Sequence, residues 1–399
     1  QALRSFAEAL TAWHALGDRL LEATTLQNLG WVSGRAGIHQ QALDYDQQAL
    51  ALFRTLELKP EEAEVLSHIA DRYLALAELP SALEYYDRAL ALREFLAPLN
   101  MGILLDNLGQ VYTNLGEYRK ALAAHQQAQA LFQELGARKD ELVTLPRIAR
   151  VHRFLGDYGQ ALDWLNRGLA LSRELKAPGE ESFNLQQLGQ FYAVTGDQAR
   201  GIEYLERAAA LCRTEKIRSC EMNAVNQLGQ LYKDQGAWEK AQTAFNEALA
   251  YVRELGSRVA EAIINGHLGD ILAAQGEYQQ ALSYQNQALT TLRTVGARQA
   301  LIVRLIRTAE TYVNAGQREK AKELLNEAAT LNQEIRNWSD EAQIFRAQAA
   351  LARDDGQLQQ ARALIEKSLL AIERQRTGAL TQSLRATFGV FLHRYYQDY

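Results

Sequence analysis

The chain has 399 residues, a formal net charge of −5, five prolines and two cysteines. Acids and bases alternate along it, so the basic stripe of a nucleic-acid binder is absent, and a membrane span is not expected because no run of about 18 apolar residues occurs. Two cysteines are too few for a disulfide framework. Abundant Ala, Leu, Gln and Glu with few prolines predict an all-α fold.

One stretch, residues 106–136, recurs along the chain as two amphipathic helices around a Gly-Glu turn. The spacing of its copies is 40 residues, with one spacing of 39, as the turn residues show: Gly37, Ala77, Gly116, Gly156, Gly196, Gly236, Gly276, Gly316 and Gly356. Such a period is typical of solenoids, whose units bury their apolar faces only against neighbours. The sequence therefore predicts an α-solenoid of antiparallel helix pairs.

In chain order, residues 1–17 align with the second helix of a repeat. We expect a capping half-repeat there, in a chain that is a piece of a longer protein. Nine full units are predicted across 18–376, with the one-residue deletion absorbed by a loop near Pro98. Prolines are expected in the first turn of a helix, where they mark unit boundaries: Pro60, Pro98 and Pro178.

Small residues recur on each first helix, where they allow two helix axes to approach closely: Gly30, Ala70, Gly109, Ala149, Gly189, Gly229, Gly269, Ala309 and Ala349. Together, LG-x-x-Y, the Gly-[Asp/Glu/Gln] turn and A-L-x-x-x-x-x-A resemble the tetratricopeptide repeat (TPR), over residues 1–376. The 40-residue period resembles the long-helix subclass found in kinesin light chains and bacterial signalling proteins. The resemblance implies a right-handed superhelix with a concave, peptide-binding groove.

From about Ala371 the repeat pattern changes, and residues 377–399 are predicted to form a capping or linker helix after a break near Thr377–Gly378. This tail resembles the segment that precedes a CHAT domain, a caspase-like peptidase domain of bacterial proteins. The residues that carry this resemblance are Ile372, Glu373, Arg376, Leu384, Arg385, Phe388, Tyr395, Tyr396 and Tyr399.

Polar side chains flank the small residue of each first helix, where the groove is expected. Amide side chains both donate and accept hydrogen bonds, which suits an extended peptide. In the TPR family the position two residues before the small residue holds bound peptides. The alternative is a solvated face that binds nothing. The two candidate ladders are Asn28, His68, Asn107, Arg147, Gln187, Gln227, His267 and Arg307, and Trp31, Asp71, Gln110, Arg150, Gln190, Gln230, Asp270 and Glu310.

The fourth unit places Arg147, Arg150 and Arg153 at intervals of three residues, which predicts a clamp for a carboxylate. Pairing of these arginines with Asp140 and Glu141 is the alternative. Pro146 lies in the same helix and is expected to kink it.

Several other residue types are assigned no ligand chemistry. The H-x-x-D pairs His68–Asp71 and His267–Asp270 lack a third metal ligand, so hydrogen-bonded pairs are expected. Cys212 and Cys220 are interpreted as apolar fillers or loop thiols. Trp31 either stacks on a ligand or packs at the end of the array. No catalytic or cofactor motif is present.

The sequence thus favours a non-catalytic, cytoplasmic protein-interaction scaffold that binds a peptide or protein partner and regulates a caspase-like peptidase in a larger bacterial protein. The alternatives are the sensor arm of a signal-transduction ATPase or transcription regulator, and a structural spacer. No metal, cofactor, nucleic acid or membrane is expected, and the oligomeric state is left open.

Overall fold

The computed structural model describes residues 2–335 and 337–377. All regular elements in these residues are helices, without a strand, and successive helices pack in pairs. The predicted all-α solenoid class is therefore confirmed. Among the described residues, no helix combines the length and apolar character needed to cross a bilayer. The chain forms two compact units, Gln1–Thr144 (unit 1) and Leu145–Tyr399 (unit 2).

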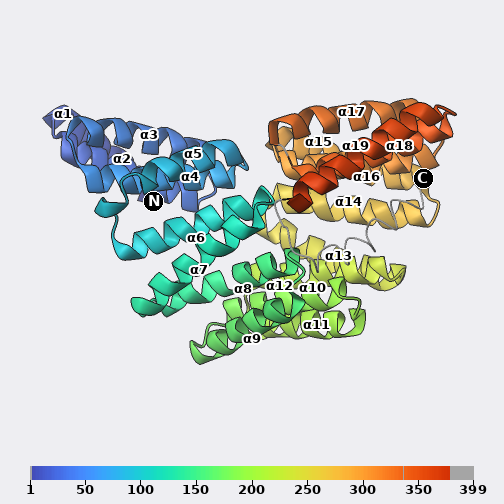
Figure 1. The fold of residues 1–399 in the computed structure, drawn as a ribbon, viewed down its shortest axis with the longest axis horizontal. Coiled ribbons are helices and arrows are strands. Elements are labelled where there is room, and N and C mark those ends of the chain that lie inside the picture. Colours follow the sequence, from blue (N-terminus) through green and yellow to red (C-terminus); the bar gives the residue numbers. More distant parts are fainter. Residues whose placement is uncertain (1, 336, 378–399) are drawn as a thin grey trace. The chain divides into compact units, whose positions relative to one another are not determined.

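Unit 1 is built from the helices that run from blue to teal in Figure 1. These helices are α1 (Ala2–Leu16), α2 (Arg19–Arg35), α3 (His39–Thr55), α4 (Lys59–Ala75), α5 (Leu79–Leu90), the 3₁₀ turn η1 (Arg93–Phe95), α6 (Pro98–Asn114) and α7 (Tyr118–Glu134). The boundary between the units falls inside α8 (Arg138–Phe154), which continues through Pro146. The predicted kink at this proline stays a prediction.

Unit 2 contains the rest of α8 and the helices coloured from green to red in Figure 1. They are α9 (Tyr158–Glu174), α10 (Pro178–Val194), α11 (Gln198–Thr214), α12 (Arg218–Asp234), α13 (Trp238–Leu255), α14 (Arg258–Ala274), α15 (Tyr278–Val295), α16 (Arg298–Asn314), α17 (Arg318–Ile335), α18 (Trp338–Asp354) and α19 (Leu358–Thr377). The predicted helix over 377–399 lies outside the described residues beyond Thr377. The unit bounds 1–17 and 18–376 stay predictions.

Each predicted turn residue has a positive φ, from 60° at Ala77 to 93° at Gly196. A left-handed residue ends one helix and allows the next to return antiparallel to it. Ala77 adopts this conformation with a Cβ atom, which costs about 1 kcal/mol relative to glycine. The expected prolines also lie in the first turns of α4, α6 and α10.

The small residues of the first helices face a large side chain from the second helix of the same pair, 16 residues further along. A Cβ atom on Gly229 would lie 2.8 Å from the ring of Phe245, and one on Gly189 would lie 2.7 Å from Leu205. Phe245 and Leu205 are fully buried. The recurrence of glycine is therefore explained by close packing between paired helices.

Consecutive pairs are joined by a repeated contact between residues eight apart. An arginine at the end of a second helix donates to a glutamate in the first turn of the next helix: Arg54 to Glu62 at 2.7 Å, Arg173 to Glu181 at 2.7 Å, Arg213 to Glu221 at 2.8 Å, and Arg253 to Glu261 at 3.0 Å. These first-turn acids also lie at the positive end of the helix dipole.

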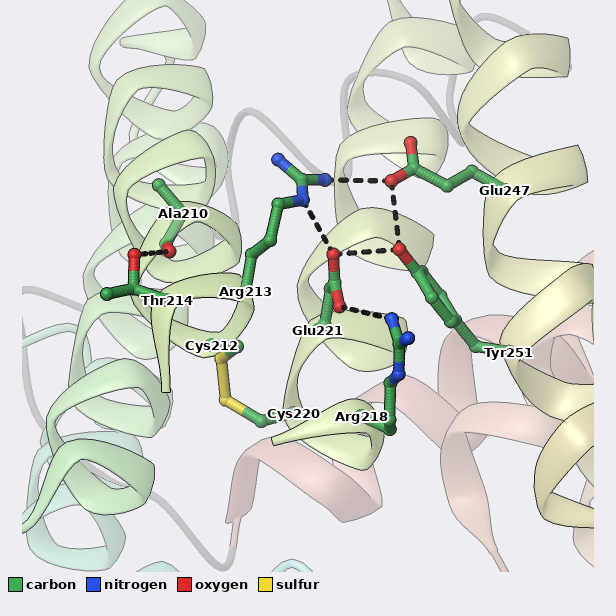
Figure 2. A network of polar contacts seen from close by, with 9 residues as sticks. All are labelled: Ala210, Cys212, Arg213, Thr214, Arg218, Cys220, Glu221, Glu247 and Tyr251. Atoms are coloured by element: carbon green, nitrogen blue, oxygen red, sulfur yellow. Dashed lines mark hydrogen bonds and ion pairs between the residues drawn. A yellow bond between two sulfur atoms is a disulfide. The ribbon is translucent and has the colours of Figure 1, made fainter. Parts of the chain in front are cut away.

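The connection between α11 and α12 carries the largest of these networks (Figure 2). Glu221 is only 1% exposed. It accepts hydrogen bonds from Arg213 and from the Tyr251 hydroxyl, each at 2.8 Å, and lies 3.5 Å from Arg218. Arg213 also donates to Glu247 at 2.8 Å. The network therefore links α11, α12 and α13 around one buried carboxylate.

The same connection corrects the interpretation of the cysteines. Cys212 and Cys220 are joined in a disulfide, with their Cα atoms 5.7 Å apart. The interpretation as apolar fillers or loop thiols was wrong, because a short turn between antiparallel helices brings residues eight apart within the usual range of disulfide Cα distances, about 4.4–6.8 Å.

Candidate functional site

The predicted polar ladders lie on the first helix of each pair. Four of their residues are exposed, namely Asn28, Trp31, Arg307 and Glu310. The others named as candidate contacts are half-buried. These are His68, Asp71, Asn107, Gln110, Arg147, Arg150, Arg153, Gln187, Gln190, Gln227, Gln230 and His267. We call the surface made by ladder residues within one unit its first-helix face.

In unit 1, ladder side chains from consecutive first helices bind one another. Asn107 on α6 donates its amide to Asp71 on α4 at 2.9 Å. The same carboxylate oxygen accepts from the hydroxyl of Tyr86 on α5. Gln110 donates to Asn114 at 2.8 Å along α6. The ladder side chains of α4 and α6 are thus within hydrogen-bonding reach of one another.

Trp31 and His68 differ from each other in how their rings are held. The guanidinium of Arg35 lies 4.9 Å from the ring centre of Trp31, which is 48% exposed. Among the described residues, His68 Nδ1 has no hydrogen-bond partner, so the hydrogen-bonded pair expected with Asp71 was wrong. Asp71 instead accepts from Asn107 and Tyr86, and burial lowers the pKa of His68.

A buried ion pair lies beneath the ladder residues of unit 1. Asp46 is completely buried, and Arg72 donates to it at 3.2 Å. Burial raises the pKa of Asp46 to about 7, although the charge of Arg72 acts in the opposite direction. A Cβ atom on Gly30 would collide with this carboxylate, so glycine at that ladder position makes room for the ion pair.

In unit 2, a ladder glutamine reaches a buried glutamine of the preceding repeat. Gln227 on α12 donates to Gln186 on α10 at 2.8 Å, and Gln230 donates to Asp234 at 2.9 Å. In the described part of the chain, the amide oxygens of Gln227 and Asn226 are buried without a hydrogen-bond partner.

A charged cluster adjoins these amides on α12, α14 and α16. Asp270 accepts from Arg304 at 2.6 Å and from Gln285 at 2.9 Å, and lies 3.6 Å from Lys233. Arg304 is 4% exposed and also donates to the Gly266 carbonyl at 2.9 Å. Burial alone would raise the pKa of Asp270, but hydrogen bonding and the nearby cations bring it below its usual range.

The second H-x-x-D pair belongs to this cluster. His267 Nδ1 lies 3.6 Å from Asp270, too far for a hydrogen bond by ordinary distance criteria. The His267 ring stacks on Phe245 with 5.1 Å between ring centres, and burial lowers its pKa. Within the described residues, no group of three or more His, Cys, Asp or Glu side chains is arranged to hold a metal ion.

The three arginines of the fourth repeat lie on one continuous helix, as their spacing predicted. The Arg153 guanidinium lies over the Phe154 ring, 4.9 Å from its centre. Glu141, one of the proposed alternative partners, lies 3.5 Å from Arg138 and accepts from Gln133 at 2.8 Å. The carboxylate clamp formed by Arg147, Arg150 and Arg153 stays a prediction.

Several residues that shape these faces were not found from the sequence. Asp46, Arg72, Gln186 and Lys233 are polar residues at least half-buried behind the ladders. A signal was present for Asp46. The same second-helix position holds an apolar or aromatic residue in most repeats, and a lone acid among them indicates a buried ionic contact.

The profile of the tetratricopeptide repeat family matches residues 1–55, 100–174 and 220–294, together just over half of the chain. The chain belongs to the tetratricopeptide repeat family. No curated protein matches this TPR chain in sequence.

Solved structures share the TPR fold at low sequence identity. A Rap protein crystallised with competence and sporulation factor has 14% identity and a TM-score of 0.54, over 84% of this chain and 99% of that one. The apo quorum sensor NprR from B. thuringiensis has 13% identity and a TM-score of 0.54, over 86% and 98%. A signal-transduction ATPase with a TPR sensor from Pyrococcus horikoshii has 14% identity and a TM-score of 0.51, over 82% and 49%.

Proposed function

We propose that the first-helix faces of this TPR array bind a peptide or a protein segment in extended form, without catalysis or a cofactor. The observation that carries the proposal is the hydrogen bonding between first helices of consecutive repeats at ladder side chains, from Asn107 to Asp71 and from Gln227 to Gln186. The amides at these positions both donate and accept hydrogen bonds, which suits the alternating N–H and C=O groups of a peptide.

The first of two settings for this binding is regulation of a caspase-like peptidase in a larger bacterial protein. It is supported by the resemblance of residues 372–399 to the segment that precedes a CHAT domain. The long-helix TPR subclass suggested by the 40-residue period belongs to the same proposal. A peptidase domain encoded after Tyr399 would support this setting.

The second setting is the sensor arm of a signal-transduction ATPase. It is favoured by the fold shared with the ATPase from Pyrococcus horikoshii, of which this chain covers 49%. A phosphate-binding loop encoded upstream of residue 1 would distinguish this setting from the first. A structural spacer remains the outcome if no partner binds.

A cytoplasmic location completes the proposal and has its own consequence. Disulfides are rare in that compartment, so the Cys212–Cys220 disulfide of the structure is expected to be reduced in rapidly alkylated cells. Recovery of the disulfide from such cells would contradict this location.

The binding claim is tested by selecting a displayed library of random octapeptides on the full chain. We expect the double variant Gln187→Ala, Gln227→Ala to reduce recovery of the selected peptides at least ten-fold, or about 1.4 kcal/mol. The control variant Gln279→Ala, Gln287→Ala changes two exposed glutamines of α15 and should have no effect. Equal recovery with all three proteins would favour the spacer.

A further inference from the structure

The last two helix pairs line a hollow. It has a volume of about 750 Å³ and lies among α16, α17, α18 and α19 of unit 2, at the orange and red end of Figure 1. Buried apolar side chains form its floor, including Ile306, Leu351 and Ile365. Pockets that hold small ligands or side chains have volumes of about 300–1,000 Å³.

The hollow exists because the ladder side chains are shortened in the ninth repeat. The two ladder positions carry Gln227 and Gln230 on α12 and Arg307 and Glu310 on α16. On α18 they carry Ala347 and Ala350, and these alanines line the hollow. Two long polar side chains are therefore replaced by open space at one end of the first-helix face.

Arginines dominate the charge around the hollow. Its lining contains Arg307, Arg346, Arg353 and Arg362, opposed by Glu310 and Asp354. Three of the arginines have exposed partners: Arg307 lies 3.1 Å from Glu310, Arg353 lies 3.3 Å from Asp354, and Arg362 lies 3.1 Å from Glu366. Exposed pairs contribute at most about 1 kcal/mol, so an incoming carboxylate can compete for these guanidinium groups at little cost.

We infer that this hollow receives an apolar side chain of an acidic peptide, with the peptide's carboxylates bound by the arginines at the rim. The inference rests on the proposed function and deepens it, because the hollow continues the first-helix face at Arg307. The apolar floor accounts for the side chain, and the excess positive charge selects acidic over basic segments.

The test uses the same octapeptide library and the full chain. The variant Ala347→Gln, Ala350→Gln restores the long side chains and fills the hollow. Its matched control is Ala363→Gln, the same change at an exposed position of α19 outside the hollow. A third protein, Arg346→Gln, Arg353→Gln, retains the hollow and removes two positive charges. Thermal unfolding followed by circular dichroism establishes that each variant is folded.

We expect wild-type chain to enrich peptides in which Asp or Glu flanks Leu, Ile or Phe. The filled variant should recover them at least ten-fold less, the Ala363→Gln control should recover them equally, and the arginine variant should lose the preference for acids. Equal recovery by the filled variant, or enrichment of peptides without acids, would overturn the inference.

Two further outcomes distinguish a failure of this inference from a failure of the proposed function. Peptides that depend on Gln187 and Gln227 but not on Ala347 and Ala350 would overturn the hollow as a site and leave the proposed function standing. If acidic peptides bind only after Phe388→Asp, Phe391→Asp replacement, the C-terminal segment is the occupant and the inference of an external peptide is wrong.

Discussion

Two buried carboxylates show how strongly the surroundings decide the behaviour of a single residue. Asp46 has the single cation Arg72 beside it, and burial raises its pKa to about 7. Asp270 is close to Arg304 and Lys233 and accepts from Gln285, and its pKa is lowered. Asp46 lies behind a polar ladder, and Asp270 belongs to one. The first therefore destabilises the fold when it ionises, whereas the second stabilises it.

Replacing Asp46 with Asn is expected to change how stability depends on pH. The pKa of Asp46 is about 7 in the folded protein and about 3.9 in the unfolded chain. Its contribution to the free energy of unfolding is therefore fully present below pH 4 and is lost as the pH rises through 7. The free energy of unfolding of the wild-type protein should thus fall between pH 5 and pH 8. Over this range, Asp46→Asn should become more stable relative to the wild type by about 2 kcal/mol. Urea unfolding at each pH measures this difference. Asp44→Asn, an exposed change on the same helix, should follow the wild type.

Replacing Asp270 with Ala is expected to be strongly destabilising. It leaves Arg304 and Lys233 without their shared carboxylate in a buried setting, a type of loss that costs about 3–5 kcal/mol. The exposed pair Arg307–Glu310 provides the comparison, because Glu310→Ala should cost less than about 1 kcal/mol. Denaturant unfolding of the two variants checks both values, and similar losses would show that the cluster is not a buried network.

At the scale of the helix pair, the small residue of the first helix determines how closely the two helices approach. Gly229 faces the buried ring of Phe245, whereas Gly159 in α9 has no neighbouring atom within 4 Å of an added Cβ. The same substitution therefore has opposite consequences at these two helical glycines.

Gly229→Ala is expected to destabilise the array by about 1–3 kcal/mol, because the added methyl group overpacks a rigid contact. Gly159→Ala should be neutral or stabilising by up to about 1 kcal/mol, since alanine favours helix. Thermal unfolding of both variants measures the contrast. Stabilisation of the Gly229→Ala protein would contradict the packing explanation.

The helix pairs could be predicted from the sequence because periodicity, turn residues and first-turn prolines all agree. The contacts between pairs could be predicted only in part. Cys212 and Cys220 are ordinary residues until the turn between α11 and α12 brings them together. Arg72 replaces a residue that is apolar in most repeats, yet the identity of its partner Asp46 depends on how two pairs stack. The candidate contact residues lie on the first helices of the pairs, and their role in binding stays a prediction.

At the scale of the whole molecule, a repeat array has no single core. In the described part of the chain, its buried apolar residues form separate clusters, some within unit 1 and others within unit 2. Each repeat mainly contacts its neighbours, so stability is close to a sum of local terms. A destabilising substitution in one repeat should therefore lower the stability of that repeat and its neighbours, and leave distant repeats unchanged.

Hydrogen exchange followed by mass spectrometry tests this locality. The Gly229→Ala variant should exchange faster in α10–α15, while α2–α5 in unit 1 should retain wild-type protection, because local openings in such arrays need not involve distant repeats. Equal acceleration in both units would instead indicate that the array unfolds as one cooperative body.

The second helix pair shows how the array accommodates a repeat that is one residue shorter than the others. Where the spacing falls to 39 residues, α5 stops at Leu90, η1 covers Arg93–Phe95, and α6 starts anew at Pro98. The missing residue is thus absorbed between pairs, and the next repeat resumes its register unchanged. Insertions and deletions during evolution, or loops grafted by an engineer, have a natural entry point at this junction.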